Sequence, residues 1–247
     1  LIKTHFLLEQ WKKEKRLNGK QFVASTIVST PAIKKIAEDF NVIYKESLTG
    51  FKWIAKMIID FPDQDFIGGG EESFGYMVGD FVRDKDAVTS ALLACEIAAA
   101  AKAGGSSFYE TLLELYTKHS FYKERLVSFT KKGMDGAEQI KQIMIDLRKN
   151  PLTHIDGSKV TFVNDYEAST EKNMITGEEK IMELPKSNVL IYHTEDGTKV
   201  AARPSGTEPK IKFYFSVQSS LDTVENAIEK EQELDTKIDR IITEMAI

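Results

Sequence analysis

The chain has 247 residues, of which 42% are hydrophobic and 29% are charged, and its formal net charge is −5 at pH 7. This composition is typical of a soluble globular protein with enough apolar material for one large core or two modest ones. Charges of both signs are interspersed without a basic block, so we expect neither a nucleic-acid partner nor a membrane partner. The single cysteine, Cys95, provides no disulfide framework, and no signal peptide is visible, so we expect a cytoplasmic protein.

Helix and strand patterns alternate in the first half of the chain. Helical spacing covers residues 3–16, 31–40, 49–60, 87–103 and 107–119, and strand patterns cover residues 21–29, 41–47 and 66–67. Such alternation predicts a three-layer α/β domain with a mostly parallel sheet. Residues 87–103 are apolar almost all round, which predicts a helix enclosed by its neighbours. A strand over 122–130 and a helix over 133–150 follow, and Asn150-Pro151 ends that helix.

Strand patterns dominate the second half. They cover residues 158–166, 188–194, 199–203 and 210–217, and a long amphipathic helix then runs from Leu221 to Met245. This order predicts a small α+β domain with an antiparallel sheet and a long C-terminal helix. We place the domains at residues 1–151 and 152–247, and we expect the polar stretch 168–179 to be a mobile loop.

Residues 203–210 read Arg-Pro-Ser-Gly-Thr-Glu-Pro-Lys and separate two of these strands. The residue types suit a phosphate, because the planar guanidinium of Arg203 can bind two oxygens while Ser205 and Thr207 offer hydroxyl donors. Gly206 lets successive backbone N–H groups converge on an anion. An ordinary hairpin turn is the alternative, since proline, serine and glycine are common turn residues.

Residues 70–75 read Gly-Glu-Glu-Ser-Phe-Gly and follow a short predicted strand, at the edge of an α/β sheet where ligands gather. A carboxylate beside a hydroxyl suits vicinal sugar hydroxyls, because Glu71 accepts hydrogen bonds while Ser73 both donates and accepts them. The alternative is a solvated surface loop with two glutamates. Arg83-Asp-Lys-Asp86 then opens the next helix, where its acids suit the helix dipole.

These motifs, in this order, resemble the phosphate-binding loop and the sugar-binding loop of the α-D-phosphohexomutases, the phosphoglucomutase/phosphomannomutase family. The similarity extends over nearly all 247 residues. The resemblance implies that Glu71 and Ser73 contact sugar hydroxyls and that Lys85 lies near the reacting hydroxyl, as a charge stabiliser or an acid/base. It also implies that Thr49 and Gly50, and with less weight Lys52, face the sugar.

The same resemblance implies that a phosphate clamp is formed by four residues with added positive charge from Lys210 and Lys212. The four clamp residues are Arg203, Ser205, Gly206 and Thr207. Its expected ligands are hexose phosphates and a hexose bisphosphate.

The family's reaction needs a Ser-His-Asn-Pro-type loop that carries the phosphoryl group and an Asp-Gly-Asp-Gly-Asp-Arg-type loop that binds Mg²⁺. Neither occurs in this sequence. The chain therefore resembles the third and fourth of the family's four domains, and a processed or truncated product is the simplest reading of its start at Leu1. We expect Mg²⁺ in the full-length enzyme, with no metal ligand in this chain, and we expect the chain alone to be inactive without the N-terminal half.

Three functions stay open. The first is the C-terminal half of a phosphoglucomutase that interconverts hexose 1-phosphate and hexose 6-phosphate through a bisphosphate. The second is a phosphopentomutase or phosphomannomutase on the same scaffold. The third is a non-catalytic module that binds sugar phosphates.

Overall fold

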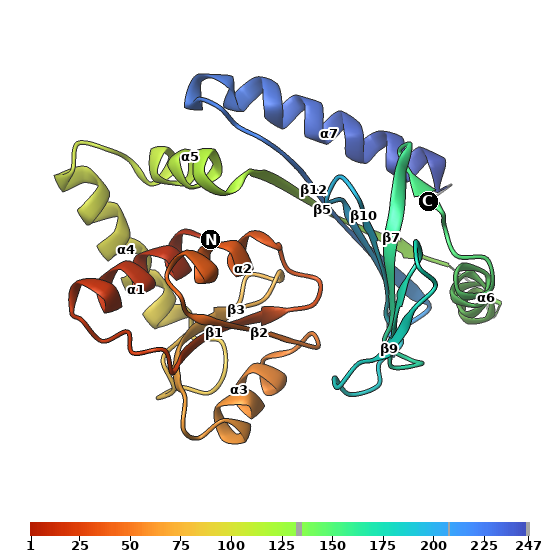
Figure 1. Cartoon of the computed structure of the whole chain (residues 1–247), viewed down its shortest axis with the longest axis horizontal. Coiled ribbons are helices and arrows are strands. Elements are labelled where there is room, and N and C mark those ends of the chain that lie inside the picture. Colours follow the sequence, from red (N-terminus) through yellow and green to blue (C-terminus); the bar gives the residue numbers. More distant parts are fainter. Residues whose placement is uncertain (132–134, 207, 246–247) are drawn as a thin grey trace. The chain divides into compact units, whose positions relative to one another are not determined.

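The computed structural model describes residues 1–131, 135–206 and 208–245. The chain forms two compact units. Unit 1 comprises residues 1–120 together with 220–227, and unit 2 comprises residues 121–219 together with the chain from Ile228 onward. Each unit has its own sheet (Figure 1).

The sheet of unit 1 has four strands in the order β2-β1-β3-β4. These are β2 (Ile43–Ser47), β1 (Gln21–Thr26), β3 (Asp65–Gly70) and β4 (Tyr76–Val78). The first three are parallel, and β4 is antiparallel to β3. Thr26 pairs with Ser47, and Ser25 pairs with Gly70, so the carboxyl ends of the three parallel strands lie together at one edge.

Helices cover both faces of this sheet. Successive side chains of a strand point to opposite faces, so the apolar residues of the central strands pack against helices on each side. Val23 of β1 packs with Leu8 of α1 (Ile2–Lys13) and Ile36 of α2 (Ala32–Asp39). Its neighbour Phe22 packs on the other face with Ile54 of α3 (Phe51–Asp60). Figure 1 shows α1 and α2 on one side of β1 and β3, with α3 on the other.

Two further helices, α4 (Ala87–Ala103) and α5 (Phe108–His119), pack against α1 through Leu93, Ile97 and Leu115. Both begin at a side-chain cap, because Asp86 accepts a hydrogen bond from the Val88 amide and Ser107 accepts one from the Glu110 amide. The expectation that α4 is enclosed on all sides is wrong, since much of its surface is exposed.

The sheet of unit 2 is antiparallel, in the order β5-β12-β11-β10-β7-β8-β9, with β6 paired to β7. Its strands are β5 (Phe121–Thr130), β6 (His154–Ile155), β7 (Ser158–Asp165), β8 (Thr170–Asn173), β9 (Glu179–Ile181), β10 (Leu190–Thr194), β11 (Lys199–Pro204) and β12 (Lys210–Ser219). A 3₁₀ turn, η1 (Val224–Asn226), precedes the last helix, α7 (Ala227–Glu244).

Helices α6 (Gly136–Lys149) and α7 belong to unit 2 (Figure 1). The Tyr192 hydroxyl of β10 donates to the Leu147 carbonyl of α6 at 2.8 Å. Lys123 of β5 pairs with Glu231 of α7 at 2.6 Å. Tyr192 and Lys123 point to the same face of the sheet by strand register, so both helices cover that face.

The predicted fold class, a mostly parallel α/β layer followed by an antiparallel sheet with a C-terminal helix, is confirmed. Strand β5 pairs along its whole length with β12, so the structure groups β5 and α6 with unit 2. The domain ranges 1–151 and 152–247 stay a prediction about the family's domains.

The expectation of a mobile loop over residues 168–179 is wrong. The segment forms strand β8 and the turn that leads to β9. Polar side chains accept hydrogen bonds from the backbone amides of the turns on either side of β8. Asp165 accepts from the Glu167 amide, and Asn173 accepts from the Ile175 and Thr176 amides. Asx turns of this kind order a polar sequence without an apolar core.

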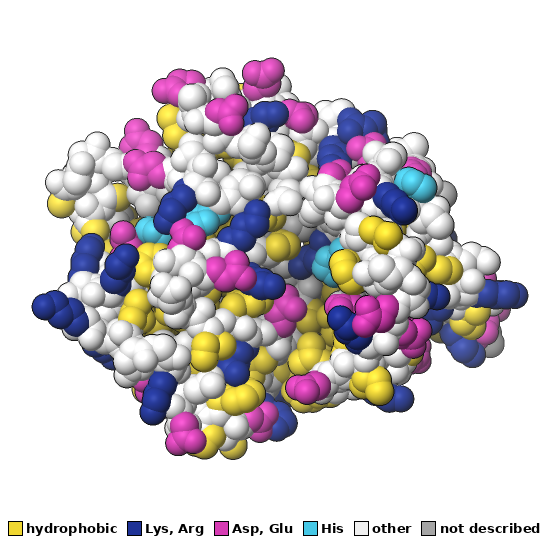
Figure 2. Space-filling model, in the orientation of Figure 1, with side chains coloured by type: hydrophobic (Ala, Val, Ile, Leu, Met, Phe, Trp, Pro, Cys, Tyr) yellow, Lys and Arg dark blue, Asp and Glu magenta, His cyan; other side chains and the backbone are white. Residues whose placement is uncertain are grey.

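Over the described residues, no single helix is long and apolar enough to cross a membrane, and α4 with α5 meets that test only as a pair bent by 85°. Lys and Arg side chains mingle with Asp and Glu over the face shown in Figure 2.

Candidate functional site

The predicted sugar-binding residues lie in unit 1 at the carboxyl edge of the parallel strands. Glu71 and Ser73 are in the loop between β3 and β4, and Thr49 and Gly50 join β2 to α3. The Glu71 amide donates to the Gly75 carbonyl at 3.0 Å and closes the β3–β4 loop.

Gly75 is the point where three segments meet. A Cβ built on this glycine would lie 2.3 Å from Cε2 of Phe51, the first residue of α3, and 3.3 Å from Cβ of Lys85. The Asp86 amide donates to the Tyr76 carbonyl at 3.1 Å, which ties the segment before α4 to the start of β4. The structure therefore brings the loop of Glu71 and Ser73 together with the start of α3 and with Lys85.

Lys85 carries an exposed cation in this group. Its ammonium lies 3.3 Å from Asp84 Oδ1 and 5.8 Å from the centre of the Phe51 ring. Hydrogen bonds from the backbone and side chain of Lys85 lower the pKa of Asp84. Both side chains of the pair are more than half exposed, so the ion pair is weak and Lys85 can turn to another anion.

The two glutamates of the loop have different surroundings. The buried Thr26 hydroxyl, at the end of β1, donates to Glu72 Oε2 at 2.7 Å. Glu71 Oε2 is enclosed and has no hydrogen-bond partner in the described part of the chain. An enclosed oxygen without a partner is costly, so Glu71 has an acceptor available for a hydroxyl donor.

Phe74 and Gly50 have backbone conformations that side chains rarely adopt. Phe74 has φ +67° and a fully exposed ring, and Gly50 has φ +117° at the start of α3. Gly50 occupies the N-cap position of α3, and no side-chain hydrogen bond caps this helix in the described structure. Non-glycine residues held at positive φ often cluster at binding sites.

Replacing Gly75 with alanine tests the close contact of this glycine with Phe51. The new methyl group would overlap the ring of Phe51, which is buried and cannot swing away, so we expect the free energy of unfolding to fall by about 1–3 kcal/mol. Urea denaturation measures this change. Gly206→Ala is the matched control, because a Cβ there meets nothing within 4 Å. Equal stability of the two variants would contradict the described packing.

The predicted phosphate-binding residues lie in unit 2, where the loop 205–209 joins β11 to β12. Arg203 pairs directly across from Lys212, so their side chains project from the same face of the sheet. Lys210, two residues before Lys212, projects from that face as well. The Ser205 amide donates to the Lys210 carbonyl at 2.7 Å. Thr207 lies outside the described residues.

Three cations at this end of the hairpin lack an ion-pair partner among the described residues. Arg203, Lys210 and Lys212 form no ion pair with any described residue. Like charges directly opposite on an antiparallel pair repel, so this end of the hairpin favours an anion. The sequence alone does not place Lys212 opposite Arg203, because that position follows from the strand register.

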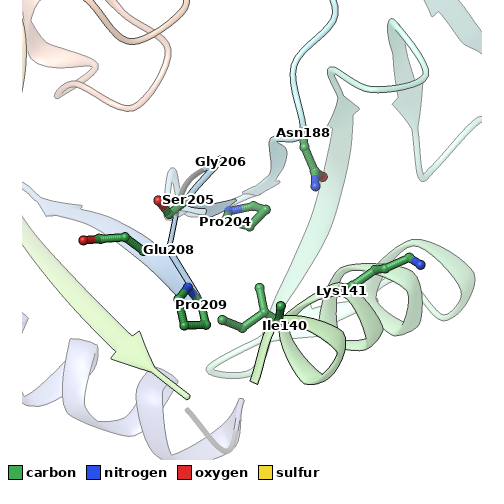
Figure 3. Close-up of a pocket in the computed structure, with 9 residues that line it drawn as sticks. Ile140, Lys141, Asn188, Pro204, Ser205, Gly206, Glu208 and Pro209 are labelled. Atoms are coloured by element: carbon green, nitrogen blue, oxygen red, sulfur yellow. The ribbon is translucent and has the colours of Figure 1, made fainter. Parts of the chain in front are cut away.

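A cavity of about 220 Å³ adjoins the loop on its other side. It is lined by Pro204, Ser205, Gly206, Glu208 and Pro209 of the hairpin, by Asn188, and by Ala137, Ile140 and Lys141 of α6. Figure 3 shows Lys141 with its ammonium directed away from the loop. Pro204 and Arg203 point to opposite faces, so the cavity is separate from the three cations.

Magnesium has no fitting ligand set in the described structure. Within residues 1–131, 135–206 and 208–245, no group of three or more His, Cys, Asp or Glu side chains could hold a metal ion.

Comparisons with known proteins identify the family to which a chain with this fold belongs. The family model described as phosphoglucomutase/phosphomannomutase α/β/α domain III matches residues 4–119. The model described as the C-terminal domain of the same family matches residues 156–234. The chain belongs to the phosphoglucomutase/phosphomannomutase family.

Known relatives agree with this assignment. The chain is 38% identical over 196 residues to a phosphoglucomutase of Staphylococcus haemolyticus, a match that covers 79% of the chain and 36% of that protein. It is also 38% identical over 199 residues to a phosphoglucomutase of Staphylococcus aureus, covering 80% of the chain and 36% of that protein. The chain thus spans about a third of the length of these relatives.

Among solved structures, the chain resembles the open form of pp63/parafusin, a phosphoglucomutase from Paramecium. The TM-score is 0.63 at 16% identity, and the match covers 98% of this chain and 41% of that one. This likeness supports the fold. The roles of the individual site residues stay predictions.

Proposed function

We propose that the chain is the sugar-recognition and distal-phosphate half of a phosphoglucomutase-type enzyme, which interconverts hexose 1-phosphate and hexose 6-phosphate through a bisphosphate. The observation that carries this proposal is the pairing of Arg203 with Lys212 beside the loop of Ser205 and Gly206, where neither cation forms an ion pair with a described residue. A phosphate dianion relieves this repulsion, and the guanidinium binds two of its oxygens.

Unit 1 supplies the sugar contacts in this proposal. Glu71 has an enclosed oxygen without a partner, and Ser73 lies exposed two residues further along the same loop. Together they offer an acceptor and a donor to neighbouring sugar hydroxyls. Lys85 lies beside this loop and stabilises negative charge on the phosphoryl group at the reacting hydroxyl.

In this proposal the sugar contacts of unit 1 and the phosphate contacts of unit 2 have different roles. Phosphoryl transfer depends mainly on positioning and on neutralising charge. Residues of unit 2 hold the phosphate that does not react, and residues of unit 1 present the sugar hydroxyl. The phosphoryl donor and the Mg²⁺ site belong to the N-terminal half of the full-length enzyme, so the isolated chain binds ligand but does not turn it over.

Two alternatives use the same residues. A phosphopentomutase or phosphomannomutase would keep the phosphate contacts and change the sugar contacts. Turnover of glucose 1-phosphate, mannose 1-phosphate and ribose 1-phosphate by the full-length enzyme distinguishes them, and equal preference for the pentose would contradict the phosphoglucomutase assignment.

A calorimetric titration of the chain with glucose 1,6-bisphosphate tests the proposal. We expect binding that is unchanged by removing Mg²⁺, no binding of unphosphorylated glucose, and no conversion of glucose 1-phosphate. Absence of bisphosphate binding would contradict the phosphate site. Conversion by the chain alone would contradict the assignment of the donor to the other half.

A further inference from the structure

A series of hydrogen bonds joins the end of β1 to the loop between β3 and β4. The hydroxyl of Thr26, the last residue of β1, donates to Glu72 Oε2 at 2.7 Å. The Ser29 hydroxyl oxygen lies 2.9 Å from Thr26 Oγ1. A threonine hydroxyl has one hydrogen, and Thr26 gives it to Glu72, so Ser29 donates to Thr26. The series therefore runs from Ser29 through Thr26 to the Glu72 carboxylate.

The two hydroxyl residues belong to a well-packed part of unit 1. Thr26 is 0% exposed and Ser29 is 6% exposed. The Ser29 amide donates to the Thr26 carbonyl at 2.9 Å and closes the turn after β1, and Thr26 pairs with Ser47 of β2. A hydrogen bond to a carboxylate is stronger than a neutral one, and successive hydrogen bonds polarise one another. Glu72 is thus attached to the core of the sheet.

The β3–β4 loop itself has an exposed tip. Ser73 is exposed, and Phe74 has a fully exposed ring and φ +67°. Exposed segments with few packed side chains open easily. Glu72 lies between the two predicted sugar contacts, Glu71 and Ser73, so its position determines the backbone from which both of them project. The hydrogen bond from Thr26 supplies an anchor from outside the loop.

We propose that Glu72 is a positioning residue, which the Thr26 hydroxyl anchors so that Glu71 and Ser73 are held in one arrangement before the sugar binds. Groups that are ordered in advance lose less entropy on binding, so the anchor raises the affinity for the sugar ring and leaves the phosphate contacts of unit 2 unchanged. The anchoring rests on the hydrogen bonds above, whereas its effect on sugar binding rests on the proposed function.

Hydrogen exchange of the Glu71 amide tests the anchoring without a ligand, because this amide closes the loop onto the Gly75 carbonyl. Thr26→Val and Glu72→Ala each break the anchor, and in both we expect the amide to exchange about tenfold faster by NMR, as for the loss of one hydrogen bond. Thr26→Ser keeps the hydroxyl and Glu72→Gln keeps an acceptor oxygen, so both are expected to exchange like the parent. Asp63→Ala, which removes an exposed carboxylate before β3, is the control and is also expected to match the parent.

A double variant shows whether the two side chains act through one hydrogen bond. If they do, Thr26→Val combined with Glu72→Ala exchanges no faster than Glu72→Ala alone. Thr26→Val alters a buried position and can impair folding, whereas Glu72 is half-buried in a loop, so Glu72→Ala and Glu72→Gln keep the test available.

Calorimetry of the same variants measures the effect on sugar binding with two probes. Glucose 1,6-bisphosphate carries the sugar ring, and hexanediol bisphosphate carries two phosphates without a ring. We expect Glu72→Ala to weaken glucose 1,6-bisphosphate binding about fivefold to tenfold, in keeping with the loss of one hydrogen bond's worth of ordering. Its affinity for hexanediol bisphosphate is expected to equal that of the parent, and Glu72→Gln is expected to restore sugar binding.

Three results would overturn the proposal. The first is parent-like exchange of the Glu71 amide in Thr26→Val and Glu72→Ala. The second is additive acceleration in the double variant. The third is an equal loss of affinity for the two probes in Glu72→Ala. If the parent chain binds neither bisphosphate, the proposed function fails and the role of Glu72 toward the sugar fails with it, while the exchange measurement still decides the anchoring.

Discussion

Arg203→Ala is expected to weaken the binding of glucose 1,6-bisphosphate by about 1.5–3 kcal/mol, the range for hydrogen bonds to a charged group. The physical reason is the loss of a planar donor pair opposite Lys212, at a hairpin end where neither cation forms an ion pair with a described residue. Isothermal titration calorimetry measures the change in dissociation constant. Arg203→Lys keeps the charge but loses the two-pronged geometry, so its affinity is expected to fall between those of Arg203→Ala and the parent.

Two controls accompany this measurement. Lys172→Ala removes an exposed cation from β8, which is separated from the hairpin by β10 and β7, and is expected to bind like the parent. Gly206→Ala leaves the folded chain without a clash, because nothing lies within 4 Å of the new Cβ. It is therefore expected to weaken binding only by obstructing a phosphate that approaches the backbone. Parent-like affinity of Arg203→Ala would remove Arg203 from the proposed site.

Acidification from pH 7 to pH 4 is expected to lower the free energy of unfolding by about 3 kcal/mol through His193 alone. Burial of the imidazole, with a smaller contribution from the nearby Lys199 cation, lowers the pKa of His193 to about 4. The unfolded chain binds this proton near pH 6.5, so between pH 6.5 and pH 4 the unfolded state holds a proton that the folded state does not. The contribution of His193 to the free energy of unfolding is therefore fully present above about pH 6.5, and it is lost as the pH falls toward 4.

Other groups act in the same direction. Burial also lowers the pKa of His5 and of His119, so both add to the loss over the same range. Urea denaturation at pH 7 and pH 4 measures the difference. His193→Gln is expected to reduce that difference, whereas His154→Gln, at an exposed position of β6, is expected to leave it unchanged. An identical pH dependence in the parent and in His193→Gln would contradict the expectation.

Local patterns in the sequence predict most of the helices and strands. The alternation in Phe22-Val23-Ala24 places the two side-chain directions of β1 against different helices. Of the two acids before the apolar run, Asp84 and Asp86, the structure uses Asp86 as the cap of α4. The polar stretch 168–179 forms a strand and a turn instead of the predicted mobile loop, because Asp165 and Asn173 accept hydrogen bonds from nearby backbone amides.

The sequence by itself determined the family, the fold class and the residue types of both candidate sites, because these depend on motifs and periodicity within short stretches. Tertiary structure decided which residues meet. It placed Phe51 and Lys85 against Gly75, set Lys212 opposite Arg203, paired β5 with β12, and left one side of α4 exposed. The physical reason is that these contacts join segments far apart in the chain, and strand register and helix packing depend on the whole core, which no local pattern specifies.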